Sequence, residues 1–205
     1  MNTCEAHMNI LYLVGLKHSG KSKLGRFASV ALSTTYRVAY TDTDDLILKA
    51  IRGTGLSVRD FYKNAGKEAF LKKEYESLRL YIEELMHHDY ELVIISTGGG
   101  VCDNDPLISL MQETGSLLYL DVSEHVLFDR IMKSGVPPFL SEANPRESFH
   151  DLYMTRSERY RQISDYMVRL SDYQTVAENG QTLTHAILNL LGRGTSCQET
   201  VLEKL

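Results

Sequence analysis

The sequence predicts an α/β fold with three layers, in which five parallel strands lie between two layers of helices. Short apolar runs alternate with longer amphipathic stretches, as is typical of βα units around a sheet that is buried on both faces. The 205 residues suffice for one domain with a real core and are too few for two domains of average size. We therefore expect a single domain over residues 1–205.

The expected elements follow the alternation of apolar runs and amphipathic stretches along the chain. Strands are expected at residues 10–14, 37–41, 92–96, 116–121 and 166–170. Helices are expected at residues 20–32, 43–52, 67–88, 106–113, 124–133, 146–163 and 183–191. This rhythm favours right-handed crossovers between parallel strands. The polar tail, residues 193–205, shows no periodic pattern, so whether it is ordered stays open.

Composition excludes several classes of partner. The formal net charge of −5 gives no positive field that would gather nucleic acid, so any phosphate site must be local. Cys4, Cys102 and Cys197 are odd in number and widely spaced, which fits a reducing compartment and forms no metal pattern. The first apolar run is too short for a signal peptide or a membrane span. We expect a cytoplasmic protein without membrane contact, and a monomer, with a dimer as the alternative.

The strongest motif is the segment 15–22, Gly-Leu-Lys-His-Ser-Gly-Lys-Ser, which follows an expected strand and opens an expected helix. This is the complete G-x-x-x-x-G-K-[ST] pattern of a phosphate-binding loop. Its glycines allow backbone N–H groups to turn inward around a phosphate at the helix N-terminus. Lys21 would reach the β- and γ-phosphates of ATP, and Ser22 would ligate Mg²⁺. The expected nucleotide-binding residues of this loop are Gly15, Ser19, Gly20, Lys21, Ser22 and Lys23.

His18 lies inside this loop and admits two interpretations. It could be a catalytic base, but a residue at a variable loop position is more often a solvated side chain. We favour the solvated side chain.

Acidic residues follow the strand expected at 37–41. Carboxyl ends of parallel strands converge on the ligand crevice, so Asp42 is predicted to serve the metal and Asp44 the substrate. The alternative is a helix N-cap, for which Thr43 or Asp44 would be suitable. Asp121 ends another strand and is more simply a strand end and helix cap.

Three glycines, Gly98, Gly99 and Gly100, directly follow the apolar run 92–96. Glycines at the carboxyl end of a strand expose backbone N–H groups and let a ligand approach closely. The alternative is a flexible turn. We favour a position where a ligand approaches the backbone.

With these three motifs in order, the chain resembles the shikimate kinase family over about residues 8–192. Further matches are Phe61, the run Gly66-Lys67-Glu68-Ala69-Phe70 with Glu74, the pair Asp129-Arg130, and Arg156 followed by Tyr160-Arg161. The resemblance implies a P-loop kinase of the nucleoside monophosphate kinase type that phosphorylates shikimate with ATP and Mg²⁺.

The resemblance also implies roles for single residues. Lys21 would contact the transferred phosphoryl group, and Ser22 and Asp42 would surround Mg²⁺. Asp44 would hold and deprotonate the acceptor hydroxyl, which makes Lys21 and Asp44 the expected catalytic residues. The binding residues implied for the acceptor are Gly98, Gly99, Gly100 and Arg156. Arg130 would lie over the nucleotide, and the loop after Leu170 would border the adenine.

Two positions depart from the family pattern. Leu71 stands where the family carries an arginine for the substrate carboxylate, and Pro137 stands where it carries a lid arginine. Leucine cannot form the planar bidentate contact of an arginine. Leu71 also opens a helical stripe that predicts packing: Leu71, Tyr75, Leu78, Ile82 and Leu85. The cations considered as substitutes are Arg59, Lys72, Lys73 and Arg146.

These departures keep other functions open. The alternatives are a kinase for a different small hydroxy acid or polyol, and a degenerate ATP-binding regulator. A GTPase is disfavoured because the sequence has no Asn-Lys-x-Asp motif. A mobile lid is expected at about residues 134–146, which contain three of the four prolines and no apolar period.

Overall fold

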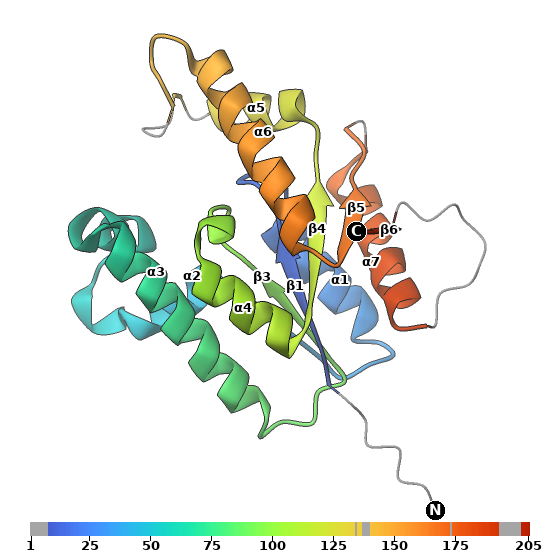
Figure 1. Cartoon of the computed structure of the whole chain (residues 1–205). Helices are drawn as coiled ribbons and strands as arrows, with labels where there is room; N and C mark the ends of the chain where they lie inside the picture. Colours follow the sequence, from blue (N-terminus) through green and yellow to red (C-terminus); the bar gives the residue numbers. More distant parts are fainter. Residues whose placement is uncertain (1–7, 134, 137–139, 173, 193–201) are drawn as a thin grey trace, which may run out of the picture.

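A computed structural model describes residues 8–133, 135–136, 140–172, 174–192 and 202–205. Its centre is a six-stranded sheet with the order β2-β3-β1-β4-β5-β6 (Figure 1). The strands are β1 (Asn9–Val14), β2 (Val38–Asp42), β3 (Leu92–Ser96), β4 (Ser116–Asp121), β5 (Tyr166–Arg169) and β6 (Leu202–Lys204). The first five strands are parallel to one another, as the sequence predicts.

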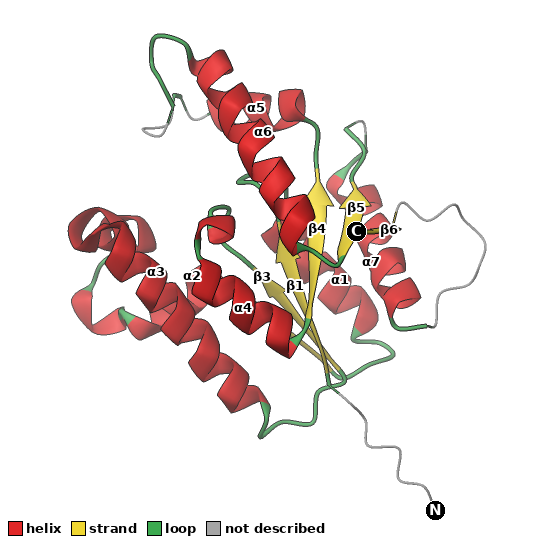
Figure 2. Ribbon diagram, in the orientation of Figure 1, coloured by secondary structure: helices red, strands yellow, loops and turns green. Residues whose placement is uncertain are grey.

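Helices cover the sheet on both faces, which confirms the predicted three layers. They are α1 (Lys21–Leu32), α2 (Thr43–Ala50), α3 (Val58–Leu85), α4 (Asp105–Thr114), α5 (Glu124–Met132), α6 (Pro145–Ile163) and α7 (Val176–Leu190). Two single-turn 3₁₀ helices are η1 (Arg52–Thr54) and η2 (Val101–Asp103). Helices α1 and α7 pack together on one face, and α4 and α6 lie on the other (Figure 2). No helix in the described ranges is long and apolar enough to cross a membrane.

The sheet has one strand more than the sequence predicts. Strand β6 is antiparallel to β5 and pairs Leu202 with Val168. The physical reason is that β5 would otherwise present an edge of unpaired backbone N–H and C=O groups. The part of the tail at 202–204 is therefore a strand, whereas 193–201 lies outside the described residues. A three-residue polar strand carries no periodic signal, so the sequence could not reveal it.

Two helices begin earlier than predicted. Helix α3 begins at Val58, where the Ser57 hydroxyl accepts the Asp60 N–H at 3.1 Å, and Gly66 interrupts it with a φ of 82°. Helix α7 begins at Val176 after a capping box, in which the Thr175 hydroxyl accepts the Glu178 N–H and the Glu178 carboxylate accepts the Thr175 N–H. Most residues in the early part of each helix are exposed, so hydrophobic periodicity detects only the later, buried turns.

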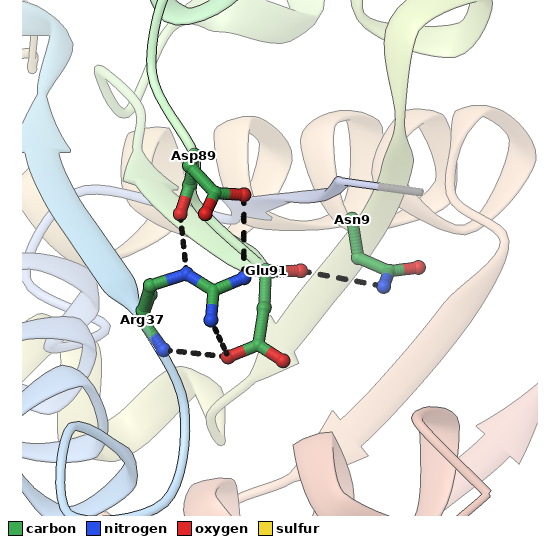
Figure 3. Close-up of polar contacts among 4 residues, drawn as sticks. All are labelled: Asn9, Arg37, Asp89 and Glu91. Atoms are coloured by element: carbon green, nitrogen blue, oxygen red, sulfur yellow. Dashed lines mark hydrogen bonds and ion pairs between the residues drawn. The ribbon is translucent and has the colours of Figure 1, made fainter. Parts of the chain in front are cut away.

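An exposed polar cluster ties together the amino ends of β1, β2 and β3 (Figure 3). The Arg37 guanidinium pairs with the Asp89 carboxylate at 3.3 Å and with Glu91 at 3.6 Å. The Arg37 N–H donates to Glu91 at 2.9 Å, and the Asn9 amide donates to the Glu91 carbonyl at 3.4 Å. Exposed ion pairs of this kind contribute little stability each. The cluster lies at the opposite end of the sheet from the predicted motifs.

The carboxyl ends of the inner strands define where a ligand can bind. Strand β1 leads into the phosphate loop, β2 ends at Asp42, and β3 leads into Thr97 and the glycine triplet. Because these strands are parallel and adjacent, their following segments meet at one edge of the sheet.

Candidate active site

A cavity of about 910 Å³ lies at this edge and brings the predicted residues together. Those that line it are Ser19, Gly20, Lys21, Ser22, Lys23, Asp42, Asp44, Gly98, Gly99, Gly100, Arg130 and Arg156. They come from five segments far apart in the sequence, so the tertiary fold is what assembles the cavity.

Gly15 is the exception, since it does not line the cavity. Its φ of 142° is a conformation that glycine adopts readily, and a Cβ there would lie 3.0 Å from the Leu120 carbonyl oxygen. Gly15 therefore shapes the loop, and its role in binding the nucleotide stays a prediction. The structure gives it one polar contact toward the site, because its carbonyl accepts the Lys21 ammonium at 2.7 Å.

Lys21 is buried at the base of the phosphate loop and is hydrogen-bonded to the loop itself. Its ammonium donates to the carbonyls of Gly15 at 2.7 Å and Leu16 at 2.9 Å, and to the Ser19 hydroxyl at 3.3 Å. Burial lowers the pKa of Lys21 to about 8, although Asp42 and Asp44 oppose this shift. The loop thus holds a desolvated cation beside the N-terminus of α1, an arrangement that suits a polyphosphate.

Asp42 uses both carboxylate oxygens. One accepts the Ser22 hydroxyl at 2.6 Å, and the other accepts the Asp44 N–H at 3.0 Å as the N-cap of α2. The cap is therefore Asp42, and neither Thr43 nor Asp44 as expected, because the chain is still extended at residue 42. Among the described residues, no group of three or more His, Cys, Asp and Glu side chains could hold a metal ion.

Asp44 follows Asp42 at the start of α2 and faces the cavity. Burial among the cavity walls raises the pKa of Asp44, and repulsion from Asp42 raises it further. Lys21 and Lys17 act in the opposite direction. A carboxylate whose negative charge is less stabilised is a stronger proton acceptor than an ordinary aspartate.

His18 lies in the loop with a φ of 67°, unusual for a residue other than glycine. Burial lowers the pKa of His18, and the positive charges of Lys17, Lys21 and Arg130 lower it further. Its backbone carbonyl accepts the Arg130 guanidinium at 3.0 Å. This contact holds Arg130 over the phosphate loop, and the His18 side chain is exposed.

The glycine triplet lies directly against the phosphate loop. A Cβ on Gly99 would lie 2.6 Å from the Lys17 nitrogen and 2.8 Å from its Cα, distances that backbone atoms cannot accommodate. The Gly98 N–H donates to the Thr43 hydroxyl at 3.0 Å, which joins the triplet to the start of α2. The triplet is therefore a fixed wall, and glycine is required at 99 for packing against the loop.

Arg156 extends from α6 to the other side of the triplet. Its Nη1 donates to the Gly99 carbonyl at 3.2 Å, and its Nη2 pairs with the Asp103 carboxylate at 2.8 Å. The sequence indicated Arg156 as a site residue but gave no sign of Asp103, which also lines the cavity.

One face of α3 closes the cavity opposite the phosphate loop. Lys67, Phe70, Leu71 and Glu74 line it at helical spacings of three and four residues. Leu71 is half-buried on the cavity wall, so the prediction that it packs with the stripe below is wrong. Leu78, Ile82 and Leu85 do belong to the core, with Tyr75 packed against it.

Glu74 is the buried acid of this wall, with 3% of the residue exposed. Burial raises the pKa of Glu74 to about 7, and Asp44 and Asp103 raise it as well. The Asn104 amide, which donates to Glu74 at 2.9 Å, opposes the shift. The carboxyl is therefore partly protonated at neutral pH.

The cations considered as substitutes for the family arginine lie elsewhere. Lys72 and Lys73 pair with Glu76 at 4.0 and 2.9 Å, and Arg146 stacks over the Phe128 ring at 4.6 Å. None of these, nor Arg59, lines the cavity. Lys17 and Lys67 do line the cavity. Sequence reasoning missed both, because nothing in the sequence around them shows on which side of the loop or helix their side chains lie.

The far end of the cavity is formed by the segment after β5. Leu170, Ser171, Gln174, Val176 and Asn179 line it, where the resemblance places an adenine border. Pro137, at the other departure from the family pattern, lies outside the described residues.

Asp121 belongs to the structure beneath the site. It ends β4 and accepts the Tyr119 hydroxyl at 3.1 Å, and it pairs with Arg169 at 3.3 Å. The cap of α5 is Ser123, so Asp121 is the expected strand end but not a helix cap.

Comparison with known proteins agrees with this geometry. The shikimate kinase family model matches residues 17–188, which is most of the chain. The chain belongs to the shikimate kinase family. It is 30% identical over 154 residues to the shikimate kinase of Sulfurihydrogenibium sp. (strain YO3AOP1), covering 75% of this chain and 84% of the relative. It is 28% identical to that of Neisseria meningitidis serogroup C (strain 053442), covering 84% and 92%. Membership of this family makes the chain a small-molecule kinase.

Solved structures show the same fold. A shikimate kinase from Acinetobacter baumannii in complex with shikimate superimposes with a TM-score of 0.71 at 23% identity, covering 90% of this chain and 96% of that one. The shikimate kinase of Bacteroides thetaiotaomicron gives a TM-score of 0.66 at 24% identity, covering 91% and 99%.

Proposed function

We propose that this chain transfers the γ-phosphate of ATP to a hydroxyl of shikimate, giving ADP and 3-phosphoshikimate. One observation carries the proposal: a single cavity joins the phosphate loop to Asp44, the glycine triplet and Arg156. Phosphoryl transfer needs two substrates held in line and charge that is neutralised, more than it needs covalent chemistry. The family of the chain supports shikimate as the acceptor.

In this proposal the phosphate loop binds the nucleotide. The backbone N–H groups at the start of α1 face the phosphates, and Lys21 moves its hydrogen bonds from loop carbonyls to phosphate oxygens. Arg130 lies over the same loop and adds a second positive charge. The segment after β5 borders the base.

Ser22 and Asp42 are the residues that would hold Mg²⁺. They present a hydroxyl and a carboxylate in direct contact, and oxygen donors of this kind suit a hard cation. The small number of protein ligands fits as well, because Mg²⁺ in kinases is bound through one or two side chains, water and phosphates. When bound, the ion would neutralise charge on the phosphates.

Asp44 is proposed as the group that orients and deprotonates the acceptor hydroxyl. It faces the cavity next to Asp42, and its raised pKa strengthens it as a base. Arg156 is proposed to hold the acceptor carboxylate, while the backbone of the glycine triplet lines the acceptor pocket. Leu71 contributes an apolar wall.

We also propose that the chain works as one domain and as a monomer, with the region near 134–146 closing over the substrates. The cavity supports the monomer because described residues of this chain form its walls on both sides. Residues 134 and 137–139 of the expected lid lie outside the described residues. Sedimentation of the active enzyme at assay concentration would show whether the working species is a monomer or a dimer.

A coupled assay of ADP release tests the function. ATP and Mg²⁺ are supplied with shikimate, with a panel of neutral polyols, or with no acceptor. We expect release that depends on shikimate, and Arg156→Ala should raise the Michaelis constant for shikimate by tenfold or more without changing that for ATP. Faster turnover of a polyol would identify a different kinase, and nucleotide binding without turnover would indicate a regulator.

A further inference from the structure

Two ion pairs connect the segment after the glycine triplet to helix α6. Asp103 pairs with Arg156 at 2.8 Å and lines the cavity. Asp105 pairs with Arg159 at 2.7 Å and does not line it. The two pairs have the same chemistry, but the first lines the cavity, whereas the second does not line it and is more exposed to solvent.

Arg156 therefore meets the cavity with both terminal nitrogens already engaged. Nη2 pairs with Asp103, and Nη1 donates to the Gly99 carbonyl. A bidentate contact with an incoming carboxylate needs two parallel N–H groups of one guanidinium edge. Arginine has five N–H donors, so an acceptor carboxylate can bind beside Asp103, but the two carboxylates then share the single positive charge of Arg156.

The charges around Arg156 determine how strongly Asp103 affects an incoming carboxylate. The charged residues that line the cavity around the glycine triplet and α3 are of both signs: the cations Lys17, Lys67 and Arg156 and the acids Asp44, Glu74 and Asp103. The side chains of Arg156 and Asp103 are 25% and 37% exposed, so solvent screens their charges in part. A carboxylate that approaches Arg156 meets the negative charge of Asp103 at close range.

We propose that Asp103 is a specificity-determining residue that competes with the acceptor carboxylate for Arg156. The competition weakens binding of acidic acceptors and leaves neutral ones unaffected, so the enzyme discriminates between them less than a free arginine would allow. This inference rests on the proposed function and deepens it, because it names the residue that tunes acceptor affinity.

The test replaces Asp103 by asparagine, which keeps the size and a hydrogen-bond acceptor for Arg156 but removes the charge. Asp105→Asn is the matched control, since it neutralises the equivalent pair outside the cavity. Steady-state kinetics are measured for wild type and both variants with shikimate and with its neutral methyl ester. Both acceptors carry the same hydroxyls, so their comparison isolates the carboxylate.

We expect Asp103→Asn to lower the Michaelis constant for shikimate about two- to fivefold, the range of a partly exposed ion pair. The constants for the methyl ester and for ATP, and kcat, should stay unchanged. Asp105→Asn should match wild type throughout. This pattern would support the competition.

Three results would count against it. A higher Michaelis constant for shikimate in Asp103→Asn would show that Asp103 positions Arg156 instead of competing with its ligand. An equal change for shikimate and the methyl ester, or no change, would show that the carboxylate is not involved. In these cases the proposed function stands. Absence of shikimate turnover in all three proteins would overturn the proposed function, and the inference with it.

Discussion

Replacing Glu74 by glutamine should change how the stability of the protein depends on pH. Glu74 is buried in the cavity wall, with 3% of the residue exposed. Glutamine has nearly the same shape and can still accept the hydrogen bond from Asn104, but it cannot ionise. The substitution therefore removes a titration while leaving the packing of α3 in place.

The magnitude follows from the pKa. Burial raises the pKa of Glu74 from 4.5 to about 7, and each pKa unit corresponds to about 1.36 kcal/mol. Because the folded pKa is raised, the folded state binds this proton more tightly than the unfolded state does. Its contribution is fully present below pH 4.5 and is lost as the pH rises through 7, about 3 kcal/mol in all. Between pH 5 and 8, the loss is about 2–3 kcal/mol.

Thermal and urea unfolding at pH 5 and pH 8 would measure this loss. The stability of wild type relative to Glu74→Gln should fall by about 2–3 kcal/mol over this interval, or about 5–10 °C in Tm for a chain of this length. Glu68→Gln is the control, because Glu68 lies exposed on the same helix. Parallel pH profiles for wild type and Glu74→Gln would show that Glu74 is ionised in the folded protein and refute the reasoning.

Three further predictions concern the phosphate loop and its neighbours. Lys21→Ala should cut kcat by orders of magnitude, because no other buried ammonium at the described base of the loop can contact the phosphates. Turnover near that of wild type would show that Lys21 takes no part in phosphoryl transfer. Asp44→Asn should lower kcat at least a hundredfold with little change in the Michaelis constant for ATP. The kcat of His18→Ala should stay within a few fold of wild type. A large loss in His18→Ala and a small one in Asp44→Asn would make His18 the base. Gly99→Ala should weaken binding of both substrates in titration calorimetry, because its Cβ would lie 2.6 Å from the Lys17 nitrogen; unchanged affinities would mean that the triplet moves freely.

Local signals in the sequence were sufficient for the centre of the fold. Strand runs buried on both faces are continuous and apolar, so β1, β3 and β4 could be predicted closely. The phosphate loop could be predicted with its flanking strand and helix because its spacing is local. Placement of Asp44 beside it followed from a general property of parallel sheets, whose carboxyl ends share one edge.

Contacts between distant segments could not be predicted. Nothing near Arg156 in the chain indicates Asp103, which lies 53 residues away and reaches it only after η2 and α6 are packed. The interruption of helix α3 could not be predicted either. After the break at Gly66, residues from Lys67 onward turn one helical face toward the cavity, whereas periodicity alone predicts that Leu71 packs with the core. These positions are the ones where substrate preference would be decided.

The hydrogen bonds of Lys21 bear on how tightly the enzyme can hold a nucleotide. In the free protein the ammonium already has three acceptors from its own loop, at 2.7, 2.9 and 3.3 Å. Affinity then reflects an exchange between two well-bonded states, and only the difference between them contributes to binding. A loop whose own groups accept hydrogen bonds from its lysine stays ordered without a nucleotide. When ADP leaves, the same contacts bind the ammonium again, so that no buried charge is left without hydrogen bonds.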